Sequence, residues 1–322
     1  MKMLITGGAG FIGTNAAQFF LPEAEKIIVL DNFLRPTSKK NADYLKKLSA
    51  KIEIYPESIL NTSLLEKLSS KVDVIIHLAG QVAVTTSLDS PQNDFEINAV
   101  GSFSLLECVR KYNPKAVIVY ASTNKVYGDL EEVKINKKKG VDESTPVDFY
   151  SPYGCSKGAA DMYMRDYSRS FGLKTVVFRQ SCIYGPWQYG VEDQGWLAFF
   201  TRQILNENII TIFGNGKQVR DLLYVDDLLK AYSFAIEKIH EIRGEVFNIG
   251  GGPENALSLV EAIDKLEAVS GKKAKVSFGK KRIGDQDFFV SNNNKLGKKL
   301  DWKVNIKVDD GLSRMMKWCK KN

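Results

Sequence analysis

The sequence predicts an α/β protein with a doubly wound parallel sheet and a smaller mixed α/β domain. Three observations predict this fold. A short apolar run over residues 1–6 leads into a glycine-rich turn and then an apolar-periodic segment. Further short apolar runs alternate with segments of helical pattern, which is typical of βαβ units and a parallel sheet. From about residue 180 the pattern becomes irregular, with Gly, Pro and Trp, as expected for a smaller second domain.

Each expected element follows from its own local pattern. Short apolar runs predict buried strands over residues 1–6, 26–30, 51–55, 72–77, 116–120, 175–178 and 246–249, the last returning to the main sheet. Helical patterns between them predict helices over residues 62–70, 91–112 and 151–171. The polar and charged stretch 129–149 predicts a surface loop. We place one domain at 1–179 plus about 220–249 and the other at about 180–219 plus 250–322.

Composition is typical of an enzyme of the cytoplasm. The 322 residues are 44% hydrophobic, without an apolar run long enough to span a membrane and without the pattern of a signal peptide. The four cysteines are scattered, without metal-ligand spacing, which fits a reducing compartment. Only two histidines are present, so a histidine-rich metal site is excluded. We therefore expect no metal and no membrane partner.

The net charge of +7 permits nucleic-acid binding in principle. The lysine clusters are dispersed, however, and aromatic residues do not interleave with them. Solvated lysines are therefore the favoured interpretation, and we expect no nucleic-acid partner.

The glycine-rich turn predicts a phosphate-binding loop. Gly7, Gly10 and Gly13 lie between the first expected strand and the first expected helix. Glycines permit a tight turn and close approach of the backbone to a pyrophosphate, and the helix N-terminus adds partial positive charge. Asp31 directly follows the second expected strand, where a carboxylate binds the ribose hydroxyls of NAD and repels the phosphate of NADP. The sequence therefore predicts NAD.

A second device lies in the expected helix 151–171, where Tyr153 precedes Lys157 by one helical turn. Residues at i and i+4 lie on one helix face. A nearby ammonium favours the phenolate and lowers a phenol pKa from about 10 toward neutrality, where a general base works best. Seen alone, such a pair is more often a Tyr and a Lys on one stripe of a surface helix.

Several motifs occur together and in order along the chain. They are TGGAGFIG (6–13), HLAGQ (77–81), YASTNKVYG (120–128), the Tyr153–Lys157 pair and GNGKQVRDLLYVDDL (214–228). With Asp31, this set resembles the extended short-chain dehydrogenase/reductases, which are NAD-dependent epimerases and dehydratases of nucleotide sugars. The resemblance covers essentially the whole chain and implies a Rossmann sheet with a nucleotide-sugar-binding domain.

The residues after Thr123 sort the chemistry within that family. The 4,6-dehydratases carry an Asp-Glu pair where Asn124 and Lys125 stand here, so the resemblance does not imply dehydration. STNKVYGDLE (122–131), DESTPVDFYSPYGCSKGAADMYM (142–164) and DQGW (193–196) are closer to the CDP-paratose (CDP-tyvelose) 2-epimerase subgroup. This implies C2 epimerisation of a CDP-linked hexose through a transient 2-keto sugar.

The resemblance also implies residue roles. Tyr153 would be the base, Lys157 would lower its pKa, and Thr123 would position the sugar hydroxyl. Where many relatives carry an Asp for the adenine, this chain has Ser58, followed by Ile59. The other residues implied for NAD binding are Gly7, Gly10, Phe11, Ile12, Gly13, Asp31, Asn32, Leu78, Ala79, Gly80, Gln81, Asn98, Ser122, Tyr153, Lys157 and Gln180.

For the substrate, the resemblance implies that Arg220 and Arg282 clamp the diphosphate, which suits a guanidinium. Besides Thr123, the other residues implied for substrate binding are Val82, Thr86, Cys182, Gln194, Gly195, Trp196 and Asp285. A homodimer, or a dimer of dimers, is implied through the helices 91–112 and 151–171. A UDP-sugar 4-epimerase, another nucleotide-sugar enzyme such as a decarboxylase, and a non-catalytic NAD-sensing member are the alternatives.

Overall fold

The computed structural model describes residues 1–130, 133, 135–282 and 284–322. It divides into two compact units. The sheet unit comprises Met1–Thr123, Ser151–Arg179 and Leu229–Phe247, and the second unit comprises Asn124–Tyr150, Gln180–Leu228 and Asn248–Asn322. These units do not share every boundary with the predicted domains, since residues 124–150 fall in the second unit. The predicted division of binding functions between domains stays a prediction.

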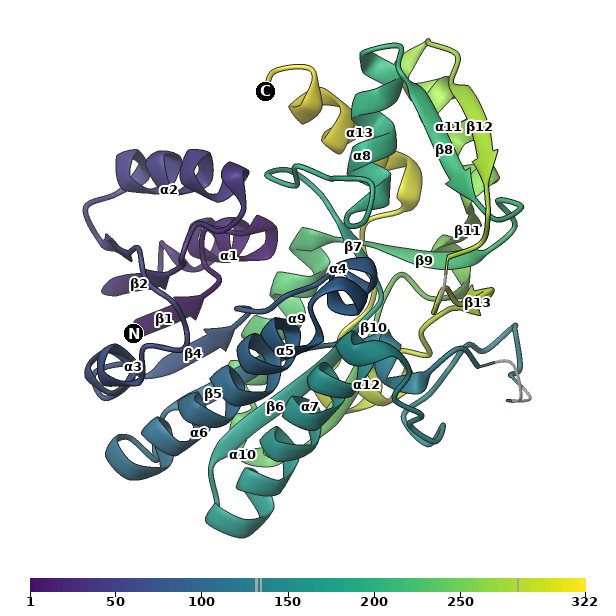
Figure 1. Cartoon of the computed structure of the whole chain (residues 1–322). Coiled ribbons are helices and arrows are strands. Elements are labelled where there is room, and N and C mark those ends of the chain that lie inside the picture. The colour runs from purple at the N-terminus through teal and green to yellow at the C-terminus, as the bar shows by residue number, and fades with distance from the viewer. Residues whose placement is uncertain (131–132, 134, 283) are drawn as a thin grey trace. The chain divides into compact units, whose positions relative to one another are not determined.

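A seven-stranded sheet forms the centre of the first unit (Figure 1). Its strands, in spatial order, are β10 (Val246–Ile249), β6 (Lys174–Gln180), β5 (Val117–Thr123), β4 (Val74–His77), β1 (Lys2–Thr6), β2 (Lys26–Leu30) and β3 (Ile52–Tyr55). The pairings from β3 through β2, β1 and β4 to β5 are all parallel. The chain runs outward from β1 to β3, then crosses to β4 on the other side, which is the doubly wound order.

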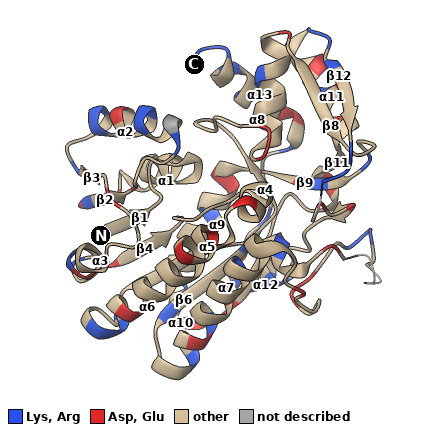
Figure 2. Ribbon diagram, in the orientation of Figure 1, with Lys and Arg blue, Asp and Glu red and all other residues tan. Residues whose placement is uncertain are grey.

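Helices connect these strands. They are α1 (Phe11–Phe20), α2 (Pro36–Leu48), α3 (Thr62–Ser69), α4 (Val84–Asp89), α5 (Pro91–Phe95), the π-helical segment η1 (Glu96–Val100), α6 (Gly101–Tyr112), α7 (Ser151–Phe171), α9 (Val225–Glu237), which begins in the second unit, and α10 (Ile239–Ile242). In Figure 1, α6 and α7 run side by side, and the rings of Phe103 and Tyr163 pack edge to face between them. Figure 2 shows both basic and acidic residues on α2 and on α6.

The apolar runs of the sequence became strands because the sheet core is buried on both faces. Every residue of β4 is buried, as are the last four of β1 and of β2. Leu4, Ile75 and Ile118, from three neighbouring strands, pack in one cluster with Leu105 of α6 and Met164 of α7. Burying one such side chain contributes about 1.5–3 kcal/mol, so this core fixes the strand order.

The second unit is a smaller mixed α/β structure. Its strands are β7 (Cys182–Tyr184), β8 (Ile209–Phe213), β9 (Val219–Tyr224), β11 (Ala256–Ser258), β12 (Lys275–Gly279) and β13 (Phe288–Phe289). Its helices are the short η2 (Asn124–Tyr127) and η3 (Pro253–Asn255), with α8 (Trp196–Leu205), α11 (Leu259–Ser270), α12 (Asn294–Leu300) and α13 (Val308–Cys319). β9 pairs with β7, β11 and β13, and β8 pairs with β12. The predicted fold class is confirmed.

Most predicted elements are found with small differences at their ends. The strands 26–30 and 246–249 and the helix 151–171 have the predicted bounds. β5 and β6 continue beyond the predicted runs, to Thr123 and Gln180. The predicted loop 129–149 includes residues 131, 132 and 134, which lie outside the described residues; the described remainder contains no helix and only an isolated bridge at Val141.

The predicted helix 91–112 is not a uniform α-helix. It is continuous, but Glu96–Val100 forms a π-helical segment between α5 and α6. Asn98 lies in this segment and donates a hydrogen bond to Asp94, one turn earlier. A π segment changes which side chains face inward and often occurs at functional sites, so the helical pattern predicted the element but not this local change. No helix among the described residues combines the length and the apolar character that crossing a membrane requires.

Candidate active site

The glycine-rich loop joins β1 to α1 at a point where backbone segments nearly touch. Gly7 has a positive φ of 66°, and a Cβ there would come within 2.7 Å of the Ala79 nitrogen, just beyond β4. A Cβ on Gly13 would lie 2.5 Å from the Cα of Gly8. Glycine is therefore required at both positions. The loop lies between the carboxyl ends of β1 and β4, where a doubly wound sheet reverses direction and binds its ligand.

Asp31 follows β2 and stabilises this loop through a hydrogen bond to its backbone. Its Oδ2 accepts a hydrogen bond from the Ala9 nitrogen, and its Oδ1 accepts one from the Phe33 nitrogen, both at 3.0 Å. Burial raises the pKa of the Asp31 carboxyl above its ordinary value, and the backbone donors oppose that rise. Each carboxylate oxygen can accept two hydrogen bonds, so ribose hydroxyls can be bound in addition to the loop.

A buried acceptor without a partner lies next to the same region. Asn98 is buried, and its Nδ2 donates to the Gln81 carbonyl at 3.1 Å. Within the described part of the chain, its Oδ1 has no hydrogen-bond partner, and it lies 2.8 Å from where a Cβ on Gly80 would be. A buried acceptor without a partner is costly, and a ligand donor would satisfy it. With the glycine loop and the uncapped N-terminus of α1 at Gly10, these residues fit a dinucleotide.

The predicted acid/base pair lies on α7 as expected. Tyr153 and Lys157 are both buried, whereas Cys155 between them is exposed. Thr123, the last residue of β5, forms a side-chain hydrogen bond with the Tyr153 phenol. β5 and α7 therefore bring Thr123 next to Tyr153, although these two residues are far apart in sequence. Lys157 follows Tyr153 by one turn of α7.

Burial dominates the protonation of this pair. It raises the pKa of Tyr153 to about 12, against the opposing hydrogen bond from Thr123. It lowers the pKa of Lys157 to about 7. The Lys157 ammonium donates to the Ala121 carbonyl at 2.6 Å and lies 4.3 Å from the ring centroid of Tyr120. Desolvation therefore opposes the expected lowering of the Tyr153 pKa, and that lowering stays a prediction.

The remaining residues predicted for NAD binding lie mostly around the carboxyl edge of the sheet. The Ser122 hydroxyl donates to Asp161 at 2.7 Å, and its role in NAD binding stays a prediction. Ser58 accepts from the Leu60 nitrogen at 3.1 Å in the turn before α3. The others lie at the start of a helix, after a strand or at its last residue. They are Phe11 and Ile12 at the start of α1, Asn32 after β2, Ile59 after β3, Leu78, Ala79, Gly80 and Gln81 after β4, and Gln180 at the end of β6.

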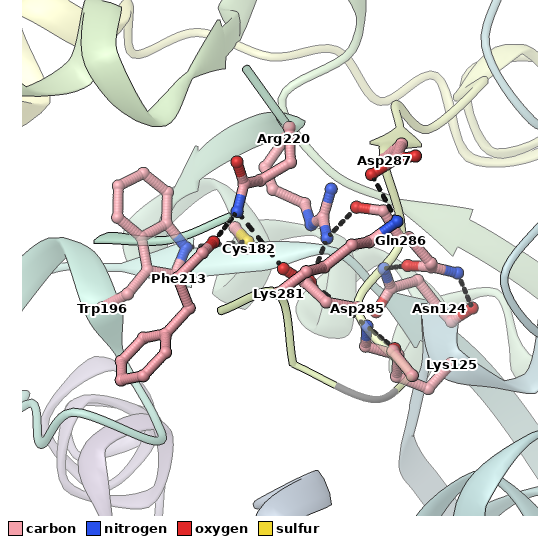
Figure 3. Close-up of polar contacts among 12 residues, drawn as sticks. Asn124, Lys125, Cys182, Trp196, Phe213, Arg220, Lys281, Asp285, Gln286 and Asp287 are labelled. Carbon is pink, nitrogen blue, oxygen red and sulfur yellow. Dashed lines mark hydrogen bonds and ion pairs between the residues drawn. The ribbon is translucent and has the colours of Figure 1, made fainter. Parts of the chain in front are cut away.

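In the second unit, a group of charged and amide side chains surrounds Asp285 (Figure 3). Arg220 donates to Asp285 Oδ1 at 2.7 Å, and the Lys125 ammonium lies 3.9 Å from the same oxygen. Lys125 also donates to the Gly284 carbonyl at 2.9 Å, and Gln218 donates to Asp285 Oδ2 at 3.3 Å. Burial lowers the pKa of Lys125 to about 8, with Arg220 acting in the same direction and Asp285 opposing it.

Two amides extend this group, which we call the Asp285 cluster (Asn124, Lys125, Gln218, Arg220, Asp285 and Gln286). Asn124 donates to Gln286 at 2.9 Å, and Gln286 donates to the Gly128 carbonyl at 2.5 Å. Arg220 donates to the Gln286 carbonyl at 2.6 Å. The cluster therefore joins η2, β9 and the segment before β13, and it presents the buried Arg220 and the partly buried Lys125 against one carboxylate.

Arg282, the second predicted phosphate ligand, has other partners. Its Nη2 lies 3.2 Å from Asp193 Oδ1, and its Nη1 donates to the Glu192 carbonyl at 3.2 Å. Its guanidinium stacks over Phe213 at 3.8 Å from the ring centroid. Arg282 is therefore held in place by a cation–π contact and by acidic neighbours that a substrate phosphate would have to displace.

The predicted nucleobase and sugar residues lie around the start of α8. Trp196 donates from its indole nitrogen to the Cys182 sulfur at 3.5 Å (Figure 3). Gly195 precedes it in a left-handed conformation, with a φ of 70°, and Gln194 bridges to Val191. These four predicted residues belong to the second unit. Val82 and Thr86 lie in the sheet unit, Val82 just before α4 and Thr86 within it.

The sequence analysis missed four members of the Asp285 cluster as site residues, among them Asn124, which like Lys125 served only to exclude dehydration. Gln218 and Gln286 were not assigned. The signal for Lys125 was its place two residues after Thr123. Gln286 carried no local signal, because its partners Asn124 and Gly128 are far from it in sequence.

Comparison with known proteins identifies the family. Residues 3–250 match the model of the "NAD dependent epimerase/dehydratase family". That match covers most of the chain, so this protein belongs to that family. It is an NAD-dependent nucleotide-sugar enzyme, as the sequence predicted.

Individual relatives cover nearly the whole chain. A Salmonella typhi protein named "CDP-paratose 2-epimerase" is 44% identical over 99% of each chain. The structure is also similar to the UDP-glucose 4-epimerase of Thermotoga maritima with UDP-glucose, at a TM-score of 0.89 and 31% identity, covering 100% of this chain and 99% of that one. The UDP-glucuronic acid 4-epimerase of Bacillus cereus, in complex with UDP-glucuronic acid and NAD, gives 0.88 and 31%, with coverage of 100% and 99%.

Proposed function

We propose that this enzyme inverts C2 of a CDP-linked hexose of the CDP-paratose/CDP-tyvelose type. The observation that carries the proposal is the 44% identity, over 99% of each chain, with the Salmonella typhi protein named "CDP-paratose 2-epimerase". The sequence after Thr123 supports it, because Asn124 and Lys125 replace the acidic pair that water elimination needs. CDP-glucose, which would give CDP-mannose, is the second substrate to test.

The residues of the sheet unit would carry the acid/base steps. Thr123 would orient the sugar hydroxyl against the Tyr153 oxygen, with which its own hydroxyl already interacts. Tyr153 would accept the hydroxyl proton and return it after the sugar has turned, so the residue ends unchanged. When bound, NAD would supply the hydride acceptor and donor for this inversion, and its positive nicotinamide ring would favour the phenolate.

The sheet unit would also hold the cofactor. Gly7, Gly10 and Gly13 would receive its pyrophosphate at the N-terminus of α1, and Asp31 would bind ribose hydroxyls. Asn98 Oδ1, which is buried and lacks a partner in the described chain, would accept a hydrogen bond from it.

The Asp285 cluster would bind the nucleotide diphosphate. Arg220 offers a planar set of donors that matches a phosphate, and Lys125 supplies a second cation beside it. We include Arg282 as a second guanidinium, with Trp196 along the nucleobase. Because Asp285 already interacts with both cations, it would keep them in place before the substrate arrives.

A UDP-sugar 4-epimerase is the second candidate, since the structure is similar to the UDP-glucose 4-epimerase of Thermotoga maritima at a TM-score of 0.89. Thr123, Tyr153 and Lys157 would serve C4 as well as C2. The two candidates therefore differ in how the sugar is held and not in the acid/base residues.

The deciding experiment is proton NMR of the anomeric region. Purified protein, with no NAD added, is incubated separately with CDP-paratose, CDP-glucose and UDP-glucose. New manno-type anomeric signals from a CDP-sugar alone are expected. A galacto-type product from UDP-glucose would move the reaction to C4, and no conversion in any tube would overturn the proposal.

We also propose a homodimer through α6 and α7. Phe103 and Tyr163 are 39% and 46% exposed on these helices, although their rings pack together 5.4 Å apart. Sedimentation velocity is the test: Phe103→Arg is expected to give monomers, and an unchanged dimer would contradict this interface.

A further inference from the structure

A second buried carboxylate lies beside the acid/base pair without having been assigned a role. Asp94 of α5 is fully buried. Its Oδ2 accepts from the Ser156 hydroxyl at 2.5 Å, and its Oδ1 accepts from Asn98 Nδ2 at 3.2 Å. Asn98 Nδ2 also lies 3.1 Å from the Ser156 oxygen. Burial raises the pKa of the Asp94 carboxyl above its ordinary value, and the hydrogen bonds from Ser156 and Asn98 oppose that rise because both partners donate to it.

The contrast with Asp161 shows why this charge matters. Asp161 is equally buried, but Arg179 binds it with two hydrogen bonds, at 2.9 and 3.0 Å, and Ser122 donates to it. Its charge is therefore matched by an adjacent guanidinium. Among the described residues, Asp94 forms no salt bridge, and the cation acting on it is Lys157.

The groups around Lys157 come from four elements. Asp161 on α7 and Asp94 on α5 both raise the pKa of Lys157, against the larger lowering by burial. Tyr120 on β5 is buried, and burial holds the pKa of its phenol far above the ordinary range, so it is neutral. His77 on β4 is neutral as well, because burial lowers its pKa to about 3. Only the two carboxylates therefore oppose loss of the Lys157 proton.

The groups around Tyr153 are fewer. The Thr123 hydrogen bond and the Arg35 guanidinium, which precedes α2, favour the phenolate. Asp94 acts in the opposite direction and raises the pKa of Tyr153. Asp94 is thus the group whose charge acts on both members of the pair, and it does so in the same direction.

We propose that Asp94 is a positioning residue for the acid/base pair: its buried carboxylate, held by Ser156 and Asn98, favours the protonated form of Lys157 in a buried site. This inference depends on the proposed function only in taking Tyr153 and Lys157 as the reacting pair. The physical reason is that a desolvated ammonium needs a counter-charge. Asp161 also acts on Lys157, and more strongly than Asp94, but it is already paired with Arg179. Ser156 precedes Lys157 directly, so the same contact also fixes that turn of α7.

The test is Asp94→Asn in the NAD-bound enzyme. The amide can fit the network with its oxygen toward Asn98 and its nitrogen toward the Ser156 oxygen, because Ser156 can then donate to the Tyr153 carbonyl, 3.2 Å away. Protein with ¹³Cε-labelled lysine is titrated by NMR, and Lys157 is assigned from the signal that Lys157→Met removes. The midpoint of Lys157 is expected to fall by about 0.5–1 pH unit.

Lys125 provides the internal control. Its pKa is also lowered, to about 8, and Asp94 is not among the groups acting on it, so its midpoint is expected to stay constant. An unchanged Lys157 midpoint in folded Asp94→Asn protein would overturn the proposal. If that variant does not fold, Asp94→Ser replaces it, and the same shift is required.

The titration uses no sugar, so it decides the role of Asp94 even if the substrate assignment fails. With a substrate in hand, both limbs of the pH profile of kcat/KM are expected to move to lower pH in Asp94→Asn. A merely structural role would instead reduce activity at every pH without moving either limb.

Discussion

The buried Lys157 and the partly buried Lys125 show how differently the two units stabilise a positive charge. Lys157 in the sheet unit and Lys125 in the second unit each donate to a backbone carbonyl, at 2.6 and 2.9 Å. Burial lowers both pKa values, to about 7 and about 8. Lys157, however, lies over an aromatic ring, whereas Lys125 shares a carboxylate with an arginine.

The difference teaches what each site is suited for. In a buried pocket with few charges, the pKa of each titratable group depends strongly on its neighbours, and acid/base chemistry needs such tuning. A network of two cations on one carboxylate holds charge in a fixed geometry, which is what binding a phosphate needs. Chemistry should therefore fail when the first site is altered, and binding should fail when the second is.

The largest expected effect separates these two roles. In Tyr153→Phe the ring remains and only the acid/base oxygen is lost, so turnover is expected to fall by about 10²–10⁴-fold. NAD is expected to stay bound, as absorbance of the released nucleotide after denaturation would check. Full activity in this variant would contradict the assignment of the base.

A smaller effect is expected from Arg220→Lys in the Asp285 cluster. Lysine keeps the charge but loses the planar donors that reach Asp285 and the Gln286 carbonyl. Hydrogen bonds to charged groups are worth about 1.5–3 kcal/mol, so KM should rise by about 10- to 100-fold while kcat changes little. Steady-state kinetics measure KM and kcat separately. A fall in kcat with an unchanged KM would contradict the assignment of the Asp285 cluster to substrate binding.

Asp31→Ala tests the cofactor preference of the sheet unit. The variant loses the ribose acceptor, the charge that repels a 2′-phosphate, and the hydrogen bonds to Ala9 and Phe33. NAD affinity is expected to drop by about tenfold, equivalent to about 1.4 kcal/mol, and NADP is expected to bind. Calorimetric titration of cofactor-stripped protein gives both affinities, and equal NAD affinity in variant and parent would count against the assignment.

The smallest expected effect concerns the burial of His77 in the sheet unit. Burial lowers the pKa of His77 to about 3, while its ring nitrogens lie 2.7 and 2.9 Å from the hydroxyls of Thr6 and Ser102. As pH falls from about 6.5 to about 3, the unfolded chain binds a proton that the folded chain does not. His77 thus contributes a loss of unfolding free energy of up to about 1.4 kcal/mol per pH unit in that window.

Urea unfolding at several pH values would measure this slope. His77→Asn is expected to unfold more easily but with a shallower dependence on pH. The matched control is His240→Asn on α10, where the side chain is exposed, and its slope should equal that of the parent. Equal slopes for all three proteins would mean that His77 does not stay neutral in the fold.

The sequence by itself determined the sheet, the cofactor loop and the helix that carries Tyr153 and Lys157. These features depend on short-range rules: an apolar run that can only be a buried strand, glycines required by a close backbone approach, and a spacing of one helical turn. Such rules act between residues near one another in the chain, so they can be read without a fold.

The tertiary structure alone decided the rest. Asp94 meets Ser156, and Asn124 meets Gln286, across long sequence separations that no local pattern records. The direction of the Tyr153 pKa shift also depended on burial, which the spacing of Tyr153 and Lys157 could not reveal. Desolvation and buried charge pairs are properties of packing, and packing exists only once the distant segments of the chain have come together.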